Sequence, residues 1–155
     1  MLEMSVKING LKELTAALKK SPELTVNELN KSIARSIGVL QNQTIKEAPV
    51  NKVAMGGNLR QSIKSAMLSR LRGEVSVEAK YGIYVHEGTA PHTIVARGKS
   101  LYNKRSGQFF GKKVNHPGTR ANPFLQRAIK VVTPRISELF TEAMNNVFNK
   151  IKSVV

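Results

Sequence analysis

One long run of helical apolar periodicity constrains the fold of this chain more than any other feature of its sequence. Over residues 25–47, apolar side chains recur mostly three or four positions apart, which places them on one face of an α-helix. These residues are Val26, Leu29, Ile33, Ile37, Leu40 and Ile45. Thr25 and Glu28 form a capping-box pattern at the start, and Pro49 disfavours helical geometry in the residue before it. The pattern predicts a long amphipathic helix over 25–47.

Shorter elements are predicted on both sides of this helix. Alternation over 5–8 predicts a strand, and leucines at helical spacing predict a short helix that ends at Pro22. Downstream, alternating apolar positions predict strands over 59–71 and 74–86, joined by a hairpin turn at residues 72–73. These strands are expected to supply the sheet of the domain.

The charge of the chain changes sharply after these strands. Residues 88–137 contain ten basic residues and no acidic residue. Within this block, 93–96 and 108–114 have the pattern of two strands that flank a polar, glycine-containing turn. The sequence therefore predicts a basic β-hairpin that projects from the body over about residues 91–116.

A final helix is predicted after this hairpin. Asn122 is its expected N-cap and Pro123 its first-turn residue, and Pro134 is expected to kink or break it. The order of elements predicts one α+β domain over residues 1–155. Its expected architecture is an antiparallel β-sheet on which the long helix of the N-terminal half and a kinked C-terminal helix pack, with the basic hairpin projecting from it.

The composition excludes several classes of chemistry. The chain carries 25 lysines and arginines against 10 acidic residues, a net charge of +15, and it has no cysteine. Disulfides, thiol catalysis and cysteine-based zinc sites are therefore excluded. All acidic residues are glutamates, which argues against metal-dependent phosphotransfer sites that recruit aspartate. Apolar runs are only a few residues long, so no segment is expected to span a membrane.

Three histidines are the strongest candidates for catalytic chemistry. His86, His92 and His116 could complete a zinc site with an open position, although their spacing matches no compact metal motif. The alternative is that they cap turns or lie on the surface. We expect no cofactor and no enzymatic activity.

The basic hairpin is the stronger candidate for function, because its cations are interleaved with Tyr102, Phe109 and Phe110. Its candidate partner- or DNA-contacting residues are Arg97, Lys99, Lys104, Arg105, Lys112 and Lys113. Cations beside aromatic rings can bind phosphates and stack on bases, without reading sequence. They can equally form a solvated or subunit-contacting surface. Composition alone leaves both interpretations open.

Two sequence blocks carry a family resemblance when they are taken together. The first runs from Tyr81 to His92 (YGIYVHEGTAPH) and the second from Val114 to Ala128 (VNHPGTRANPFLQRA). The pair resembles the neck, or tail-completion, proteins of long-tailed bacteriophages, which are also labelled minor tail or head–tail joining components. An Ala-Pro-Val at 48–50 and a Leu-Arg-x-Ser-Ile at 59–63 are similar to the same family, although Gly-Gly-Asn replaces its usual Thr-Gly before the latter.

The resemblance implies a structural protein of the virion neck, made and assembled in the bacterial host cytoplasm. Such a protein joins the head, on its portal or connector side, to the tail within a ring around the DNA channel. Six-fold symmetry is favoured and twelve-fold symmetry is the alternative. Its expected partners are copies of itself, head-closure or connector proteins, tail-terminator or tail-tube proteins, and packaged DNA through non-specific contacts. The alternative function is sequence-independent nucleic-acid binding by the basic hairpin.

The residues of the two blocks have expected structural roles at the base of the hairpin. Gly88 lets the chain leave at a sharp angle, Glu87 and Thr89 hydrogen-bond exposed backbone, and residues 117–118 turn the chain back. Phe124 is expected to fix the last helix on the sheet. The complete set is Tyr84, Glu87, Gly88, Thr89, His116, Pro117, Gly118, Thr119, Pro123 and Phe124.

Overall fold

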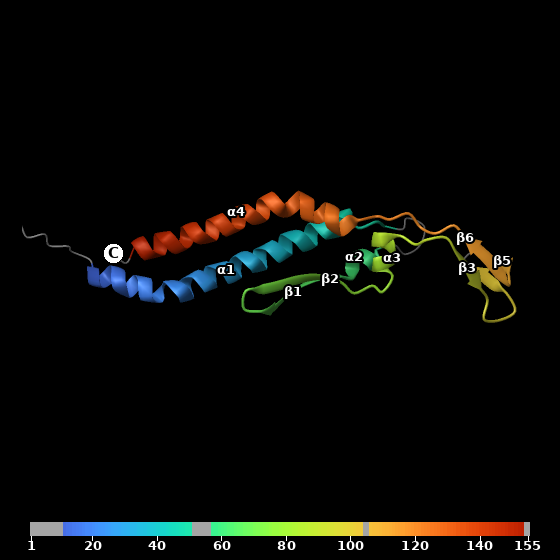
Figure 1. The fold of residues 1–155 in the computed structure, drawn as a ribbon, viewed down its shortest axis with the longest axis horizontal. Helices are drawn as coiled ribbons and strands as arrows, with labels where there is room; N and C mark the ends of the chain where they lie inside the picture. The colour runs from blue at the N-terminus through green and yellow to red at the C-terminus, as the bar shows by residue number, and fades with distance from the viewer. Residues whose placement is uncertain (1–10, 51–56, 104–105, 154–155) are drawn as a thin grey trace, which may run out of the picture.

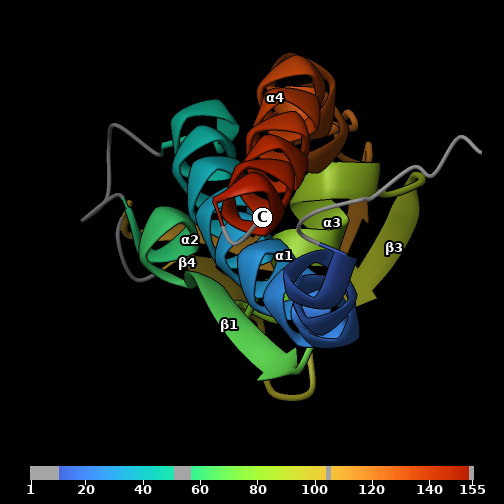
Figure 2. The ribbon, with the colours of Figure 1, turned by 90° about the vertical axis from the view of Figure 1, so that its left-hand side faces the viewer.

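The computed structural model describes residues 11–50, 57–103 and 106–153, so the strand predicted over 5–8 lies outside the described residues. Helix α1 (Leu11–Glu47) and helix α4 (Phe124–Lys152) run side by side in opposite directions and form an elongated body. Small β-elements lie along α1 and at the end of the body away from the C-terminus (Figures 1 and 2). No described helix is long and apolar enough to cross a membrane.

Helix α1 is continuous over 37 residues, so the predicted break at Pro22 is wrong. An internal proline removes one backbone hydrogen bond and costs about 3 kcal/mol in an isolated helix. Helix α4 is antiparallel to α1, its C-terminal half lies beside the first half of α1 (Figure 1), and Lys150 near its end donates a hydrogen bond to Glu28 of α1. Packing along a whole helix outweighs a single local defect.

Helix α1 meets α4 through small polar residues. Glu28, Ser32 and Ser36 are buried and share one helical face. The Glu28 carboxylate accepts hydrogen bonds from Lys150 Nζ of α4 at 2.7 Å and from Lys31 Nζ at 2.9 Å. Helix α4 contributes apolar residues, and those buried in it are Phe124, Ala128, Val132, Leu139, Ala143 and Val147. The buried face of α1 at these positions is therefore polar, whereas the buried face of α4 is apolar.

Part of the predicted apolar stripe of α1, including Ile33 and Ile37, packs instead on a β-hairpin made of β1 (Ile63–Ser69) and β2 (Arg72–Val77). A Cβ atom placed on Gly73 would lie 2.8 Å from Ile37 Cγ2 and 3.0 Å from Ile33 Cγ2. Gly73 is therefore a strand residue over which α1 passes closely. The predicted turn at 72–73 is wrong, because β1 ends at Ser69 and β2 begins at Arg72, so residues 70–71 connect the two strands.

Two further strand predictions fail at their ends. The predicted strand over 59–71 begins only at β1, because the short helix α2 (Asn58–Gln61) precedes it. The predicted strand over 74–86 stops at Val77, and helix α3 (Gly82–Glu87) follows. The carbonyl oxygens of Val85 and His86 at the end of α3 accept hydrogen bonds from the Asn122 backbone N–H, so a distant segment holds the helical geometry.

The main apolar core lies where these elements meet. Ala48, Leu59, Ile63 and Phe124 are buried together, although they come from the end of α1, from α2 and β1, and from the distant start of α4. Phe124 is fully buried, which fixes the start of α4 on the hairpin and on the end of α1. The beginning of α4 is thereby held in a defined position relative to the segments that precede it.

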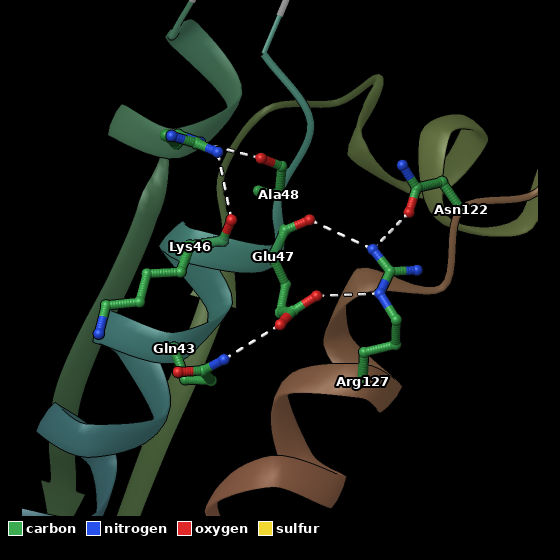
Figure 3. Close-up of polar contacts among 7 residues, drawn as sticks. Gln43, Lys46, Glu47, Ala48, Asn122 and Arg127 are labelled. Atoms are coloured by element: carbon green, nitrogen blue, oxygen red, sulfur yellow. Dashed lines mark hydrogen bonds and ion pairs between the residues drawn. The ribbon is translucent and has the colours of Figure 1, made fainter.

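Arg127 ties the end of α1 to the start of α4 (Figure 3). Its Nε donates to Glu47 Oε2 at 3.0 Å, and its Nη2 donates to the Glu47 carbonyl oxygen at 3.2 Å and to Asn122 Oδ1 at 2.7 Å. Asn122 is therefore not the predicted N-cap, because its side chain faces Arg127 and Pro123 occupies the cap position. Helix α4 continues through Pro134, and Figure 1 shows a bend in its N-terminal part, as expected for a kink.

The chain between α3 and α4 forms a distal lobe, residues 92–116, at one end of the molecule (Figure 1). Strand β3 (His92–Val95) pairs with β6 (Lys113–His116), and β4 (Leu101–Asn103) pairs with β5 (Gln108–Gly111). The single strand predicted over 108–114 is wrong, because Gly111, with a φ of 77°, divides it. The predicted α+β class is confirmed, with three two-stranded antiparallel sheets among the described residues.

Candidate functional site: the distal lobe and its stem

The distal lobe is joined to the body by a stem, residues 87–91 and 117–121, in which two chain segments run antiparallel and pair with each other. The Thr89 N–H donates to the Thr119 carbonyl oxygen at 2.9 Å, and the Thr119 N–H donates to the Thr89 carbonyl oxygen at 3.0 Å. The two threonines form an isolated antiparallel bridge. The bridge fixes the separation of the two segments at the point where they leave the body.

Two glycines make this close approach of the two segments possible. Gly88 and Gly118 have φ values of 76° and 87°, in the left-handed region that disfavours other residues. A Cβ atom on Gly88 would lie 2.4 Å from the Thr119 carbonyl oxygen, and one on Gly118 would lie 2.2 Å from the Thr89 carbonyl oxygen. Each glycine therefore packs against the threonine of the opposite segment. Both the backbone conformation and the space require glycine at these positions.

The side chains of the other residues expected at the base of the hairpin differ in exposure and in hydrogen bonding. Tyr84 is 61% exposed, and Glu87 and Pro117 are also exposed. The Glu87 side chain makes no hydrogen bond with a described residue, and the Thr89 hydroxyl is buried without a partner there. The expectation that these two side chains bond the backbone is therefore wrong. The backbone of Thr89 performs that role.

The three histidines are not assembled into a metal site. His92 and His116 lie opposite each other on β3 and β6, with ring centroids 5.0 Å apart, while His86 packs edge-on against Phe124. His116 Nδ1 accepts a hydrogen bond from the Gly118 N–H at 3.0 Å, so this histidine caps the turn of the stem. Within the described ranges, no group of three metal-ligating side chains comes together.

Four of the predicted basic residues lie on the surface of the lobe. Arg97 and Lys99 are exposed in the connection between β3 and β4, and Lys112 and Lys113 are exposed at the junction of β5 and β6. The Ala96 N–H donates to the Lys112 carbonyl oxygen at 2.9 Å, which brings the two connections together. None of the four makes an ion pair with a described residue. Lys104 and Arg105 lie outside the described residues.

An apolar cleft of about 470 Å³ lies between the two ladders of the lobe and was not predicted from the sequence. Its lining residues are Ile94, Leu101, Tyr102, Asn103, Phe110, Val114 and His116. Phe109 does not line the cleft; it is 70% exposed, and its ring lies 4.6 Å from that of Tyr102. The sequence showed only that four very short segments carry apolar residues. How these residues come together in a cleft depends on the pairing of β3 with β6 and of β4 with β5.

Comparison of the chain with protein-family models, with curated proteins and with solved structures finds no match.

Proposed function

We propose that this protein is a non-enzymatic, structural component of the neck of a long-tailed bacteriophage. It would join the head, on its portal or connector side, to the tail as a subunit of a ring around the DNA channel. The observation that carries the proposal is the meeting of the two family-like blocks in the stem. Gly88 and Thr89 of the first block pack against Gly118 and Thr119 of the second.

The organisation of the molecule supports an assembly role. A long helical body presents a small basic lobe at one end, and the stem fixes how the lobe departs from the body (Figure 1). His116 caps the turn of the stem and His86 packs against Phe124, and among the described residues no acidic side chain bonds either of them. These features suit a protein that contacts several neighbours at once.

Exposed apolar side chains support contacts between subunits. Ile83 and Tyr84 of α3 are 57% and 61% exposed, and α4 exposes Ile129, Val131 and Phe148. A closed ring uses heterologous interfaces, in which one face of each subunit meets a different face of the next. Two separate apolar surfaces meet that requirement. Six copies are favoured and twelve are the alternative, with head-closure or connector proteins and tail-terminator or tail-tube proteins as the adjacent components.

The proposal is tested in the phage that encodes the chain. An amber codon in its gene should give DNA-filled heads and separate tails in a non-suppressing host, and supplying the protein in trans should restore joined particles. Electron microscopy of the gradient-purified particles measures both outcomes and locates the subunit at the junction. Joined, infectious particles that lack the protein would overturn the proposal.

A deletion variant tests the role of the lobe within this function. Replacement of residues 98–112 by Asn-Gly keeps the pairing of β3 with β6 and leaves the core of Ala48, Leu59, Ile63 and Phe124 untouched. We expect the purified variant to melt cooperatively near the wild-type temperature but to fail to join heads to tails. Loss of cooperative melting would show that the lobe is part of the folding unit.

Sequence-independent nucleic-acid binding is the second candidate function. It is favoured by the four exposed, unpaired cations of the lobe and by the exposed ring of Phe109. A nucleic-acid-binding protein should bind duplex DNA as a monomer, with log affinity falling linearly with log salt concentration. Measurement of that slope by fluorescence anisotropy, with and without residues 98–112, separates this function from an assembly role.

A further inference from the structure

We infer that the distal lobe docks an acidic segment of a partner protein, and that one large apolar side chain of that segment sits in the cleft between the two ladders. The inference deepens the proposed function by giving the chemistry of a neighbour at the junction.

The cleft is an apolar surface without an occupant from the described chain. Its volume of about 470 Å³ falls within the range of about 300–1,000 Å³ that is usual for ligand-binding sites. Tyr102 and Phe110 line it while remaining 48% and 42% exposed. Covering such rings stabilises a complex by about 25 cal/mol per Å² of apolar surface removed from water. The cleft can therefore anchor an apolar side chain.

The charges around the cleft determine the sign of its partner. Lys112 and Lys99 each lie two positions from a lining residue, whereas Lys113 directly precedes the lining residue Val114 on β6 and so points to the opposite face of the ladder. These lysines have no acidic partner among the described residues, and residues 88–137 contain no acidic residue at all. A partner with carboxylates would neutralise this surface and be steered toward it.

The chemistry of the lining favours a protein partner over a nucleic acid. Single-stranded nucleic acids bind on aromatic rings whose faces are free to stack on bases. In the lobe, Tyr102 and Phe109 already pack on each other, with ring centroids 4.6 Å apart. Besides the rings of Tyr102, Phe110 and His116, the lining includes the aliphatic side chains of Ile94, Leu101 and Val114, which contact an apolar side chain but cannot stack on a base. An acidic segment with an apolar anchor satisfies both the charge and the cleft.

Four fluorescein-labelled probes test the inference with the full-length chain. The first is a twelve-residue peptide rich in glutamate with one central phenylalanine. The second replaces that phenylalanine by serine, the third replaces the glutamates by glutamine, and the fourth is a twelve-base-pair DNA duplex. We expect the first peptide to bind at least tenfold more tightly than each of the other peptides and more tightly than the duplex.

Matched variants locate the binding. F110S should lose the tenfold advantage of the phenylalanine peptide, whereas F109S, which alters an exposed ring outside the cleft, should retain it. The pair K99E/K112E should lose binding of both acidic peptides, whereas K130E/K152E, with the same change of net charge on α4, should not. Circular dichroism of each variant verifies that the helical body is folded.

Three results would overturn the inference: equal binding of the phenylalanine and serine peptides, no measurable binding of the acidic peptides, or tighter binding of the duplex. Any of these would leave the neck proposal standing, because that proposal is decided in phage particles. Conversely, joined particles without the protein would not alter the peptide result.

Discussion

Thr89 and Thr119 exchange both of their backbone hydrogen bonds, at 2.9 and 3.0 Å, although one lies before the distal lobe and the other after it. This bridge holds the two ends of the lobe together independently of the residues inside it. Gly88 lies against the Thr119 carbonyl group and Gly118 against the Thr89 carbonyl group. The stem therefore sets the direction in which the lobe leaves the body.

Gly118→Ala is expected to disrupt the stem. The new Cβ would overlap the Thr89 carbonyl oxygen, and the residue would keep a φ that costs about 1–2 kcal/mol for L-residues. We expect a total destabilisation of the stem of at least about 2 kcal/mol, because a backbone clash adds to this strain. Faster hydrogen exchange at the Thr89 and Thr119 amides measures the effect.

Gly107→Ala is the matched control for this substitution. Gly107 also has a positive φ, of 69°, but a Cβ there would meet no atom within 4 Å. Gly107→Ala should therefore be destabilised only by the strain of its backbone conformation. Hydrogen exchange at the Thr89 amide should be unchanged in this variant. Equal effects of the two substitutions on that amide would contradict the role assigned to close packing in the stem.

Gly73→Ala is expected to separate the β1–β2 hairpin from α1. Its Cβ would lie 2.8 Å from Ile37 Cγ2, so the hairpin or the isoleucines must shift, at a cost of about 1–3 kcal/mol. Gly38→Ala, in α1 itself, meets no atom and should stabilise the helix by about 0.5–1 kcal/mol. Urea unfolding of both variants should therefore give changes of opposite sign.

Glu28 makes the pairing of α1 with α4 sensitive to acid. Hydrogen bonds from Lys150 and then Lys31 lower the pKa of this carboxyl from 4.5 to about 2. A carboxyl whose pKa is lower in the folded protein stabilises it above the ordinary value of 4.5. That contribution is lost progressively as the pH falls from about 4.5 to about 2. We expect the melting temperature to decrease over this range.

The variant Glu28→Gln should remove this part of the acid dependence and lower the melting temperature at pH 7. Glu78→Gln is a suitable control, because Glu78 is exposed and makes no ion pair with a described residue. It should leave both the melting temperature and its pH profile near those of the wild type. An unchanged acid profile in Glu28→Gln would refute the assignment.

Arg127→Lys is expected to destabilise the junction of α1 and α4 by about 1–2 kcal/mol, despite the conserved charge. The guanidinium donates at once to the carboxylate and carbonyl of Glu47 and to Asn122, and a single ammonium group cannot reproduce this geometry (Figure 3). Chemical denaturation measures the loss. Lys130→Arg, at an exposed position of α4, is the control and should be neutral. An Arg127→Lys variant with the same free energy of unfolding as the wild type would show that only the positive charge matters at the junction of α1 and α4.

The periodic parts of the sequence predicted the fold best. The apolar stripe of residues 25–47 lies within α1, and Ile33 and Ile37 of this stripe contact the β1–β2 hairpin. The α+β class is also confirmed. Prediction failed where distant contacts override local preference. Alternation over 74–86 favoured one long strand, but Asn122 bonds the end of α3 and holds a helix there.

Sequence by itself determined which segments are amphipathic, where the acid-free basic block lies and where glycine and proline occur, because these properties belong to individual residues and their spacing. The tertiary structure decided what they contact. The buried position of Glu28 follows from the antiparallel packing of α4, and the cleft follows from two ladders that meet at Ala96 and Lys112. Such features depend on residues far apart in the chain, so no local pattern can encode them.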